Sequence, residues 1–164
     1  MKKIGKKLVA ELMKDSKRSD RELAKVLGVS QPTITRSRRR LVEEGVIEGF
    51  TAIPDFAKLG YEIMAITVGN YIEMSTRTPQ LLEKGRKWIG RYPNIIFATR
   101  AEGLGKDAIM ISLHKNYSDY AKFMKDMRLD FGEFMKNTES LIVCMKEPMA
   151  KPLTFRGLGQ DIEG

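Results

Sequence analysis

The sequence has almost none of the residues that build disulfides or metal sites. Its 164 residues include one cysteine, Cys144, and one histidine, His114. A single thiol cannot close an internal disulfide, and one histidine with one cysteine cannot complete a tetrahedral metal site. Both residues fall in strand-like segments, where we expect them to pack as ordinary sheet residues, since free cysteine is among the most buried residue types. Zinc fingers and disulfide scaffolds are therefore excluded, and no metal ligand is predicted.

Long apolar runs and enzyme motifs are also missing. No apolar stretch approaches the roughly 20 residues that span a bilayer, so no membrane partner is expected. The basic segment 1–18 is interrupted by charged residues and has no small-residue cleavage site after it, so we interpret it as an amphipathic helix of a cytoplasmic protein. Walker, Rossmann and zinc-protease motifs are absent. We therefore predict a protein that is not an enzyme and has no catalytic residues and no cofactor.

Positive charge is present in excess, and it is concentrated at one end of the chain. The formal net charge is +8. Residues 1–42 carry 13 lysines and arginines against four acidic residues, a net +9, whereas the rest of the chain carries 16 basic and 17 acidic residues, a net −1. Such a concentration is the electrostatic footprint of a polyanion partner. A solvated basic surface without a partner could have the same charge. The pattern of helices and side chains within residues 1–42 is what distinguishes the two alternatives.

Capping signals in the basic region predict three helices. Apolar residues recur every four positions over residues 4–12, which is typical of one face of a helix. Residues 19–22, SDRE, have the S-x-x-E form of a capping box and begin a second helix, which Gly28 ends. Ser30 is then a second N-cap, with Pro32 in the first turn of a third helix. Two short helices joined by a glycine-containing turn indicate a helix-turn-helix.

We expect two small domains, because helix content, charge and periodicity all change near residue 60. Residues 1–54 are predicted to form the helix-turn-helix domain, in which residues 46–53 make two short strands of a wing. Residues 55–60 are a linker. Residues 61–148 are predicted to form a ferredoxin-like domain of order β-α-β-β-α-β, and residues 149–164 a poorly ordered or draped tail. The predicted class is α+β.

Within the second domain, we expect strands at residues 62–72, 95–101, 107–114 and 140–146. The second helix is predicted to begin at a Ser118 cap.

The third helix of the basic region has one packed side and one arginine-rich side. At 100° per residue, Ile34 and Leu41 share the packed side, whereas Arg36 and Arg39 fall near the opposite pole. Arginine can donate two hydrogen bonds to a guanine edge, which contributes about 1–3 kcal/mol of discrimination. Hydroxyls and amides at a helix N-terminus bind phosphate. This pattern favours a DNA partner over an unpartnered basic surface.

The predicted contacts lie along this arginine-rich side. We place Gln31, Thr33 and Arg36 near base edges, because the N-terminal half of such a helix enters the groove. Arg39 and Arg40 are placed at phosphates. The full predicted set is Ser30, Gln31, Thr33, Thr35, Arg36, Arg39 and Arg40. Arg38 falls near the packed side, where we expect its stem to lie along the core edge while its guanidinium reaches water.

These segments resemble the leucine-responsive/asparagine-operon (Lrp/AsnC) family of regulators. The matching pieces are S-x-R-x-L-A from residue 19, G-V-S from 28, L-x-x-x-G-V-I-x-G-F from 41 and P-D-x-x-x-L-G from 54. The order of elements that follows is similar to the family's effector-binding, oligomerising domain, so the resemblance covers about residues 4–147. It implies a homodimer, often assembled into octamers, that binds operator DNA and is controlled by an amino acid or related small molecule.

The family's glycine-rich turn implies where an effector would bind. Family members usually have G-x-x-D-Y between the middle strands, and this chain has Gly103, Gly105 and Asp107 there without the aromatic residue. The turn could offer amides to a carboxylate and an acceptor to an ammonium group, or it could be a simple hairpin connection. We prefer the hairpin. The chain also departs from the family at Arg38, where members usually have an apolar residue.

Several functions remain to be compared. A dimeric sequence-specific regulator and an effector-independent architectural protein both bind duplex DNA, but the second has little sequence preference. RNA binding through the sheet would need exposed aromatic residues on the central strands, where residues 95–101 contain only Phe97 and residues 107–114 contain none. We therefore predict a sequence-specific transcription regulator, with the architectural protein as the alternative.

Overall fold

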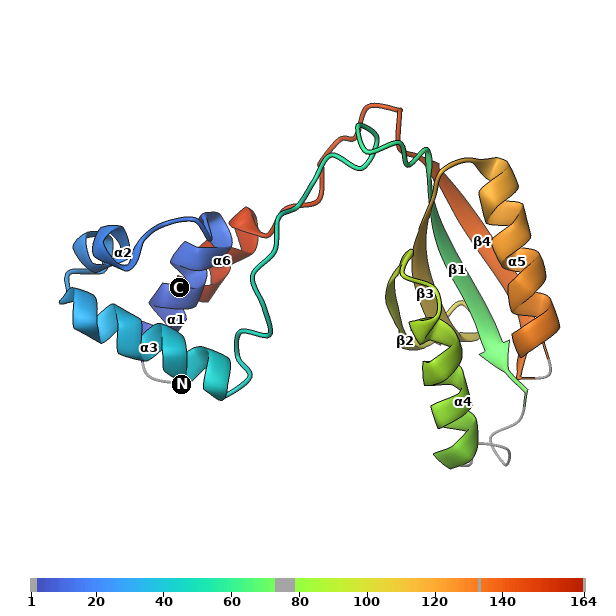
Figure 1. The fold of residues 1–164 in the computed structure, drawn as a ribbon, viewed down its shortest axis with the longest axis horizontal. Coiled ribbons are helices and arrows are strands. Elements are labelled where there is room, and N and C mark those ends of the chain that lie inside the picture. The colour runs from blue at the N-terminus through green and yellow to red at the C-terminus, as the bar shows by residue number, and fades with distance from the viewer. Residues whose placement is uncertain (1–2, 73–78, 133, 164) are drawn as a thin grey trace. The chain divides into compact units, whose positions relative to one another are not determined.

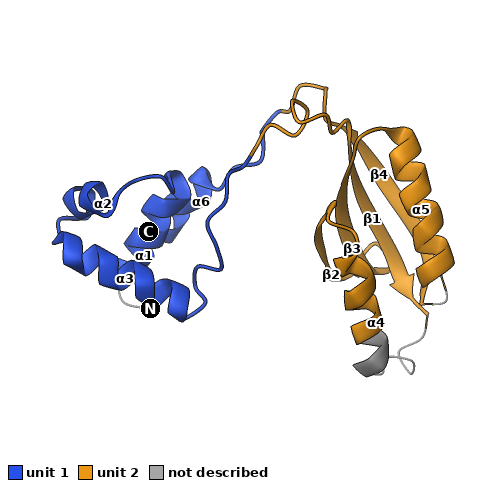
Figure 2. Ribbon diagram, viewed as in Figure 1, with its two compact units in different colours: residues 1–53, 150–164 blue, residues 54–149 orange. Residues whose placement is uncertain are grey.

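The computed structural model describes residues 3–72, 79–132 and 134–163. The chain folds into two compact units, which Figure 2 colours separately. Unit 1 contains residues 1–53 and 150–164, and unit 2 contains residues 54–149. The chain therefore leaves unit 1 and later returns to it. The predicted α+β class is confirmed, with helices in unit 1 and a helix-covered sheet in unit 2 (Figure 1).

Unit 1 is built on three helices, α1 (Lys3–Lys14), α2 (Asp20–Leu27) and α3 (Gln31–Glu43). Their apolar stripes meet in one core, because each helix has apolar residues at three- and four-residue spacing. The buried members of this core are Leu8, Leu12, Leu23, Ala24, Ile34 and Leu41. Four of them, including Ile34 and Leu41 on α3, are completely buried. The packed side predicted for the third helix is confirmed.

The segment after α3 does not form the two strands that we expected of a wing. Residues 46–53 are all described, and they contain no strand. The amides of Val46 and Ile47 both donate to Leu41 O, at 2.9 and 3.0 Å. These bonds turn the chain back against the end of α3, so that Ile47 packs on the core. The alternation of apolar residues here therefore reflects a capped helix end and an irregular segment, not a hairpin.

The C-terminal segment is a helix, which corrects the prediction of a poorly ordered or draped tail. Helix α6 (Arg156–Glu163) belongs to unit 1 and packs against α1. Gly159 is buried, and a Cβ atom there would lie 2.7 Å from Ala10 O. Ala10 is completely buried although it lies on the side of α1 opposite Leu8. Helix α1 is therefore covered on two sides, by α2 and α3 and by α6.

Unit 2 has the predicted order of elements. These are β1 (Ile63–Tyr71), α4 (Pro79–Gly90), β2 (Ile95–Gly103), β3 (Lys106–His114), α5 (Tyr117–Phe131) and β4 (Met135–Cys144). The four strands form one antiparallel sheet in the order β2-β3-β1-β4. Strand β4 begins five residues earlier than expected. A Cβ at Gly69 would lie 2.8 Å from Met135 Cε, so the glycine of β1 makes room for this early segment.

Helices α4 and α5 cover one face of this sheet (Figure 1). Aromatic residues join the two helices, and the Trp88 ring of α4 stacks on Phe131 of α5 at 5.5 Å between centroids. The buried members of this core are Trp88, Met110, Phe123, Met124 and Met127. Helix α5 is capped by Asn116, whose side chain accepts the Asp119 amide, and not by Ser118 as predicted. Asn116 lies in extended backbone directly before the helix, where an N-cap side chain can reach the third amide.

The two residues expected to pack in the sheet have different environments. His114 is completely buried, and its Nε2 atom lies 2.8 Å from Ser112 Oγ. Cys144, by contrast, is exposed at the end of β4. The packing prediction is therefore right for the histidine and wrong for the cysteine.

Candidate nucleic-acid interface

Hydrogen bonds at both ends of α2 define the helix-turn-helix. Ser19 Oγ accepts the Glu22 amide at 3.2 Å, and the Glu22 carboxylate accepts the Ser19 amide at 2.7 Å, which confirms the capping box. The hydrogen bonds that the Ser19 hydroxyl and the Ser19 amide donate to the Glu22 carboxylate lower the pKa of Glu22. Gly28 ends α2 with a φ of 65°, a left-handed conformation that side chains disfavour. Residues 28–30 then lead directly into α3.

The first turn of α3 differs in one detail from the predicted cap. Ser30 occupies the N-cap position, but its side chain makes no capping bond to the helix backbone. Its hydroxyl instead lies 2.8 Å from the Thr33 hydroxyl. Ser30 and Gln31 are exposed and Thr33 is half-buried, so the start of α3 presents polar groups to solvent.

The outward side of α3 is arginine-rich, as the periodicity predicted. Arg36 and Arg39 are exposed, whereas Ile34, Ser37 and Leu41 are buried on the other side. Among the described residues, the Arg36 side chain has no hydrogen bond or ion pair. A free guanidinium keeps all five of its donors for a partner.

Arg39 and Arg40 have intrahelical partners one turn further along α3. Arg39 Nε lies 2.7 Å from Glu43 Oε1, and Arg40 Nε lies 3.6 Å from Glu44 Oε1. The hydrogen bond that Arg39 donates to the Glu43 carboxylate raises the pKa of the Arg39 guanidinium. The Arg39 side chain is 81% exposed, so water competes with this pair and a phosphate could replace the carboxylate.

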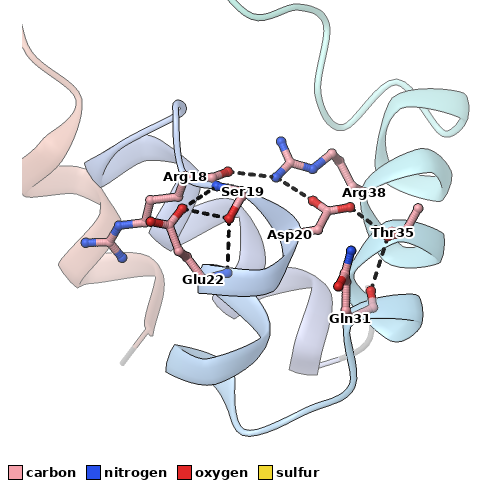
Figure 3. Close-up of polar contacts among 7 residues, drawn as sticks. All are labelled: Arg18, Ser19, Asp20, Glu22, Gln31, Thr35 and Arg38. Atoms are coloured by element: carbon pink, nitrogen blue, oxygen red, sulfur yellow. Dashed lines mark hydrogen bonds and ion pairs between the residues drawn. The ribbon is translucent and has the colours of Figure 1, made fainter.

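Arg38 does not extend into water as expected, because it is held inside unit 1 (Figure 3). Arg38 Nη2 forms an ion pair with Asp20 Oδ1 at 2.7 Å and donates to Arg18 O at 3.3 Å. The other carboxylate oxygen, Asp20 Oδ2, accepts the Thr35 hydroxyl at 2.7 Å. The position of Arg38 near the packed side is thus explained by an acidic partner on α2.

Asp20 is the functional candidate that sequence reasoning missed. Its position in the first turn of α2 already explains an acidic residue there, because negative charge is favoured at a helix N-terminus. Its partners Thr35 and Arg38 lie 15 and 18 residues away, beyond the reach of helical spacing. The one signal in the sequence was the charged residue on an otherwise packed side of α3.

In unit 2, the hairpin between β2 and β3 borders an open hollow of about 430 Å³. Lys106 Nζ lies 2.6 Å from Glu139 Oε1 and donates to Asn137 O at 2.7 Å. Asn70 Nδ2 donates to Gly105 O at 2.6 Å. The hollow is lined by Val68, Asn70, Leu104, Gly105, Lys106, Asn137, Thr138 and Glu139.

Of the three predicted effector residues, Gly105 lines this hollow, whereas Gly103 and Asp107 are not in its lining. Gly103 pairs with Lys106 at the end of the hairpin. One oxygen of Asp107 accepts the Tyr71 amide at 2.8 Å, so this carboxylate connects β3 to β1. The three residues are therefore close in the chain but do not converge on one space.

No other chemistry is apparent in the described part of the chain. No group of three or more His, Cys, Asp or Glu side chains there is placed to hold a metal ion. None of the helices described is long and apolar enough to cross a membrane.

Comparison with known proteins agrees with the geometry of α2 and α3. A family described as winged helix-turn-helix DNA-binding matches residues 1–48. The chain is similar to the HTH-type transcriptional regulator FL11 of Pyrococcus furiosus, with 36% identity over 145 residues that cover 85% of this chain and 87% of the relative. The relatives are transcription regulators and not enzymes.

Solved structures show the same fold. The structure of an AsnC family transcriptional regulator from Agrobacterium tumefaciens has a TM-score of 0.76 at 19% identity, over 92% of this chain and 94% of the other. A transcriptional regulator from Neisseria meningitidis, solved as a complex with L-Met, has a TM-score of 0.75 at 14% identity, over 96% and 99% of the two chains. The chain, with its helix-turn-helix and its β-α-β-β-α-β domain, belongs to the Lrp/AsnC family of DNA-binding transcription regulators.

Proposed function

We propose that this regulator binds a specific operator as a homodimer, with α3 in the major groove of duplex DNA. The observation that carries the proposal is the outward side of α3, where the exposed Arg36 has no partner within the described residues. A guanidinium without an internal partner can pair with a base edge without first breaking another bond. The burial of Ile34 and Leu41 keeps the arginine-rich side of α3 turned towards solvent.

The proposed contacts divide into base and phosphate contacts. Gln31, Thr33 and Arg36 occupy the N-terminal half of α3, which in helix-turn-helix proteins lies nearest the bases. Arg39 and Arg40 lie beyond them and exchange Glu43 and Glu44 for phosphates. Ser30 and Thr35 complete the set. Thr35 is included because it is exposed. Its hydroxyl already donates to Asp20, so it would contact DNA as an acceptor or through its methyl group.

A dimer is proposed because one face of the sheet has an apolar surface without helices. Met64, Ile66 and Val68 alternate with the residues of β1 that face the helices. Leu141 pairs with Ile66 and is 71% exposed, and Phe97 on β2 is 49% exposed. Two copies of this face can pack as aligned sheets. Such two-fold symmetry also suits a palindromic operator with two half-sites.

Control by an amino-acid-like effector is the finer part of the proposal. The hollow beside Gly105 offers an ammonium group on Lys106 and a carboxylate on Glu139, which complement the carboxylate and ammonium groups of an amino acid. Gly103 and Asp107 shape the hairpin that borders this hollow. Titration of single L-amino acids in a calorimeter tests this part. No heat and no change in melting temperature with any amino acid would contradict it.

Selection from a pool of randomised duplex DNA at one fixed salt concentration tests the central proposal. A sequence-specific dimer is expected to enrich a motif with two half-sites about one helical turn apart, or a multiple of it, near 10 base pairs. A pool that binds but yields no motif would contradict the proposal and favour the architectural alternative. Fixed salt is essential because binding to phosphates changes steeply with ionic strength.

A further inference from the structure

We propose that Asp20 is a positioning residue for sequence reading, which orients α3 through Thr35 and Arg38. The inference rests on the proposed role of α3 in reading bases. It assigns base preference in part to a residue on α2 that need not touch a base.

The carboxylate of Asp20 holds two residues of α3 at once (Figure 3). Oδ1 pairs with Arg38 Nη2 and Oδ2 accepts the Thr35 hydroxyl, each at 2.7 Å. Thr35 and Arg38 are three residues apart, so they lie on neighbouring turns of the same helix face. Two attachments on successive turns limit rotation of α3 about its axis and sliding along it. We call this set of bonds the Asp20 clamp.

The α2 side of the Asp20 clamp is itself fixed. Asp20 is the first residue of α2 and follows Ser19, whose capping box with Glu22 defines the helix start. Arg38 Nη2 also donates to Arg18 O at 3.3 Å, just before this cap. The guanidinium is therefore bound to the backbone before α2 as well as to its first side chain.

The Asp20 clamp is more sheltered than the other arginine pairs of α3. The side chains of Asp20 and Arg38 are 21% and 23% exposed, compared with 58% and 81% for Glu43 and Arg39. The Phe50 ring lies beside the Arg38 guanidinium, with its centroid 5.7 Å from Cζ. Salt and water weaken a sheltered pair less than an exposed one. The clamp therefore persists under conditions in which Arg39 and Arg40 exchange their partners.

A directional contact is needed because the core alone does not fix the rotation of α3. Ile34 and Leu41 are buried among apolar side chains, whose attraction is non-directional. Arg36 follows Thr35 directly, so a rotation of α3 carries its long side chain sideways. A bidentate hydrogen bond to a base tolerates little displacement. Loss of the Asp20 clamp is thus expected to impair base reading more than binding to phosphates.

The test compares Asp20→Asn with Glu22→Gln, two neutralising substitutions within the first turn of α2. The wild-type protein first selects its operator from randomised duplex DNA. Each variant is then titrated with that operator and with a scrambled duplex of the same composition and length, at the same salt. Asp20→Asn is expected to bind the operator about tenfold more weakly, the scale of one weakened base contact. Binding of Asp20→Asn to the scrambled duplex should stay within about threefold, since the phosphate contacts remain.

Glu22→Gln removes a charge from the same helix turn, but glutamine can still accept the Ser19 amide in a capping box. The bonds of α2 to α3 stay intact, so the ratio of the two affinities should not change. Circular dichroism checks that each variant is folded at the titration temperature. An unchanged ratio for Asp20→Asn, or an equal loss of ratio for Glu22→Gln, overturns the inference. A wild-type selection without a motif overturns the proposed function together with the inference, whereas a wild-type motif that Asp20→Asn reads equally well overturns the inference alone.

A double-mutant cycle separates the clamp from a general loss of charge. Arg38→Met keeps the stem of the side chain and removes its pair with Asp20. If both residues act through one clamp, Asp20→Asn should reduce the ratio less in the Arg38→Met background than in the wild type, because only the Thr35 bond is then left to weaken. Additive losses would mean that the two residues act separately and would contradict the inference.

Discussion

Arg36 is the residue of α3 whose removal should be most informative. Arg36→Ala deletes an exposed guanidinium that has no internal partner among the described residues, so its loss leaves the fold of unit 1 intact. Operator affinity should fall about 10- to 100-fold, since a bidentate base contact contributes roughly 1–3 kcal/mol. Preference should relax at one position of each half-site, which selection with the variant measures. An equal loss of affinity on every sequence would instead make Arg36 a phosphate contact.

Arg39 should behave differently, because its position and exposed Glu43 pair suit a phosphate contact. Arg39→Ala is expected to make the slope of log affinity against log salt shallower by about 1 per half-site, with base preference retained. Titrations at four salt concentrations give the slope. Lys87→Ala on α4, an exposed lysine with a similar glutamate pair, serves as the control and should leave the slope unchanged. Altered base preference in Arg39→Ala would contradict the phosphate role.

His114 makes the stability of unit 2 sensitive to pH. Burial among Tyr120 and Phe123 lowers the pKa of His114 below its usual 6.5, and the Asp119 carboxylate opposes this shift only in part. Above pH 6.5 the imidazole is neutral in both states. Below it the unfolded chain takes up a proton that the folded protein does not, so the free energy of unfolding falls as the pH falls.

His114→Gln removes this titration and measures it. The wild type should lose its stability advantage over the variant as the pH falls from 7 towards the lowered pKa. Urea unfolding at several pH values, followed by the fluorescence of Trp88 in the same core, gives both curves. Parallel curves for the two proteins would show that His114 does not titrate differently in the folded state.

At the residue level, the sequence indicated the exposed face of α3 but not the Asp20 clamp. Helical periodicity places Arg36 and Arg39 because it depends on spacing within one helix. Pairing between Asp20 and Arg38 depends on how two helices cross, which spacing within either helix does not contain. The exposure of Cys144 was missed for a related reason, because it depends on which side chains reach the end of an edge strand.

Among the elements, α6 allows the most specific test, because its packing on α1 depends on one glycine. Gly159 packs so closely on α1 that an added Cβ would meet Ala10 O at 2.7 Å, whereas a Cβ at Gly157 would meet nothing nearer than Lys151 Nζ at 3.9 Å. Gly159→Ala should therefore reduce the free energy of packing of α6 on α1 by about 1–3 kcal/mol. Gly157→Ala, the same change in the same helix, should stabilise it by up to about 1 kcal/mol.

The rate of native-state trypsin cleavage at Arg156 reports the loosening of α6. If α6 must leave α1 before trypsin can cut, the cleavage rate follows the population of the undocked state. Gly159→Ala should then be cut several-fold to about a hundredfold faster than the wild type, as a loss of about 1–3 kcal/mol implies. Gly157→Ala should be cut no faster than the wild type. Equal rates for all three proteins would show that α6 does not depend on this close contact.

Capping and turn signals predicted the elements that local sequence controls. The capping box of α2 and the glycine at its end follow from residues within one turn of each other. Helix α6 and the missing wing strands depend on distant partners, since α6 is stabilised by α1 and a strand needs a second strand beside it. The early start of β4 has the same cause. Pairing with β1 includes residues 135–139 in the strand, although few of them are apolar.

At the scale of the whole molecule, the two units carry different surfaces. Unit 1 holds the helix-turn-helix, and unit 2 has a sheet with one helix-covered face and one apolar face. Element order predicted the sheet, but whether its second face is covered could not be read from order alone. Met64, Ile66 and Val68 of β1 lie on the face without helices, and large apolar residues are unusual on a face that meets water. The second copy proposed above would cover this face and account for its apolar residues.

Leu141→Lys tests that partner, because it puts a charge at the centre of the apolar face. Leu141 pairs with Ile66 of β1 and is 71% exposed in the single chain. Burying a lysine in an interface without a counter-charge is costly, so the dissociation constant of the dimer should rise by at least about tenfold in sedimentation equilibrium. Operator affinity should fall with it, because one copy reads a single half-site.

Leu129→Lys is the matched control. Leu129 is 74% exposed on α5, so the same substitution at equal exposure should change neither the dimer nor operator affinity. If Leu141→Lys stays dimeric while Leu129→Lys dissociates, the dimer forms through the helices and not the sheet. If both variants stay dimeric, neither face is the interface. With one half-site per copy, as proposed, the sheet face of unit 2 would then have no part in the spacing of the operator.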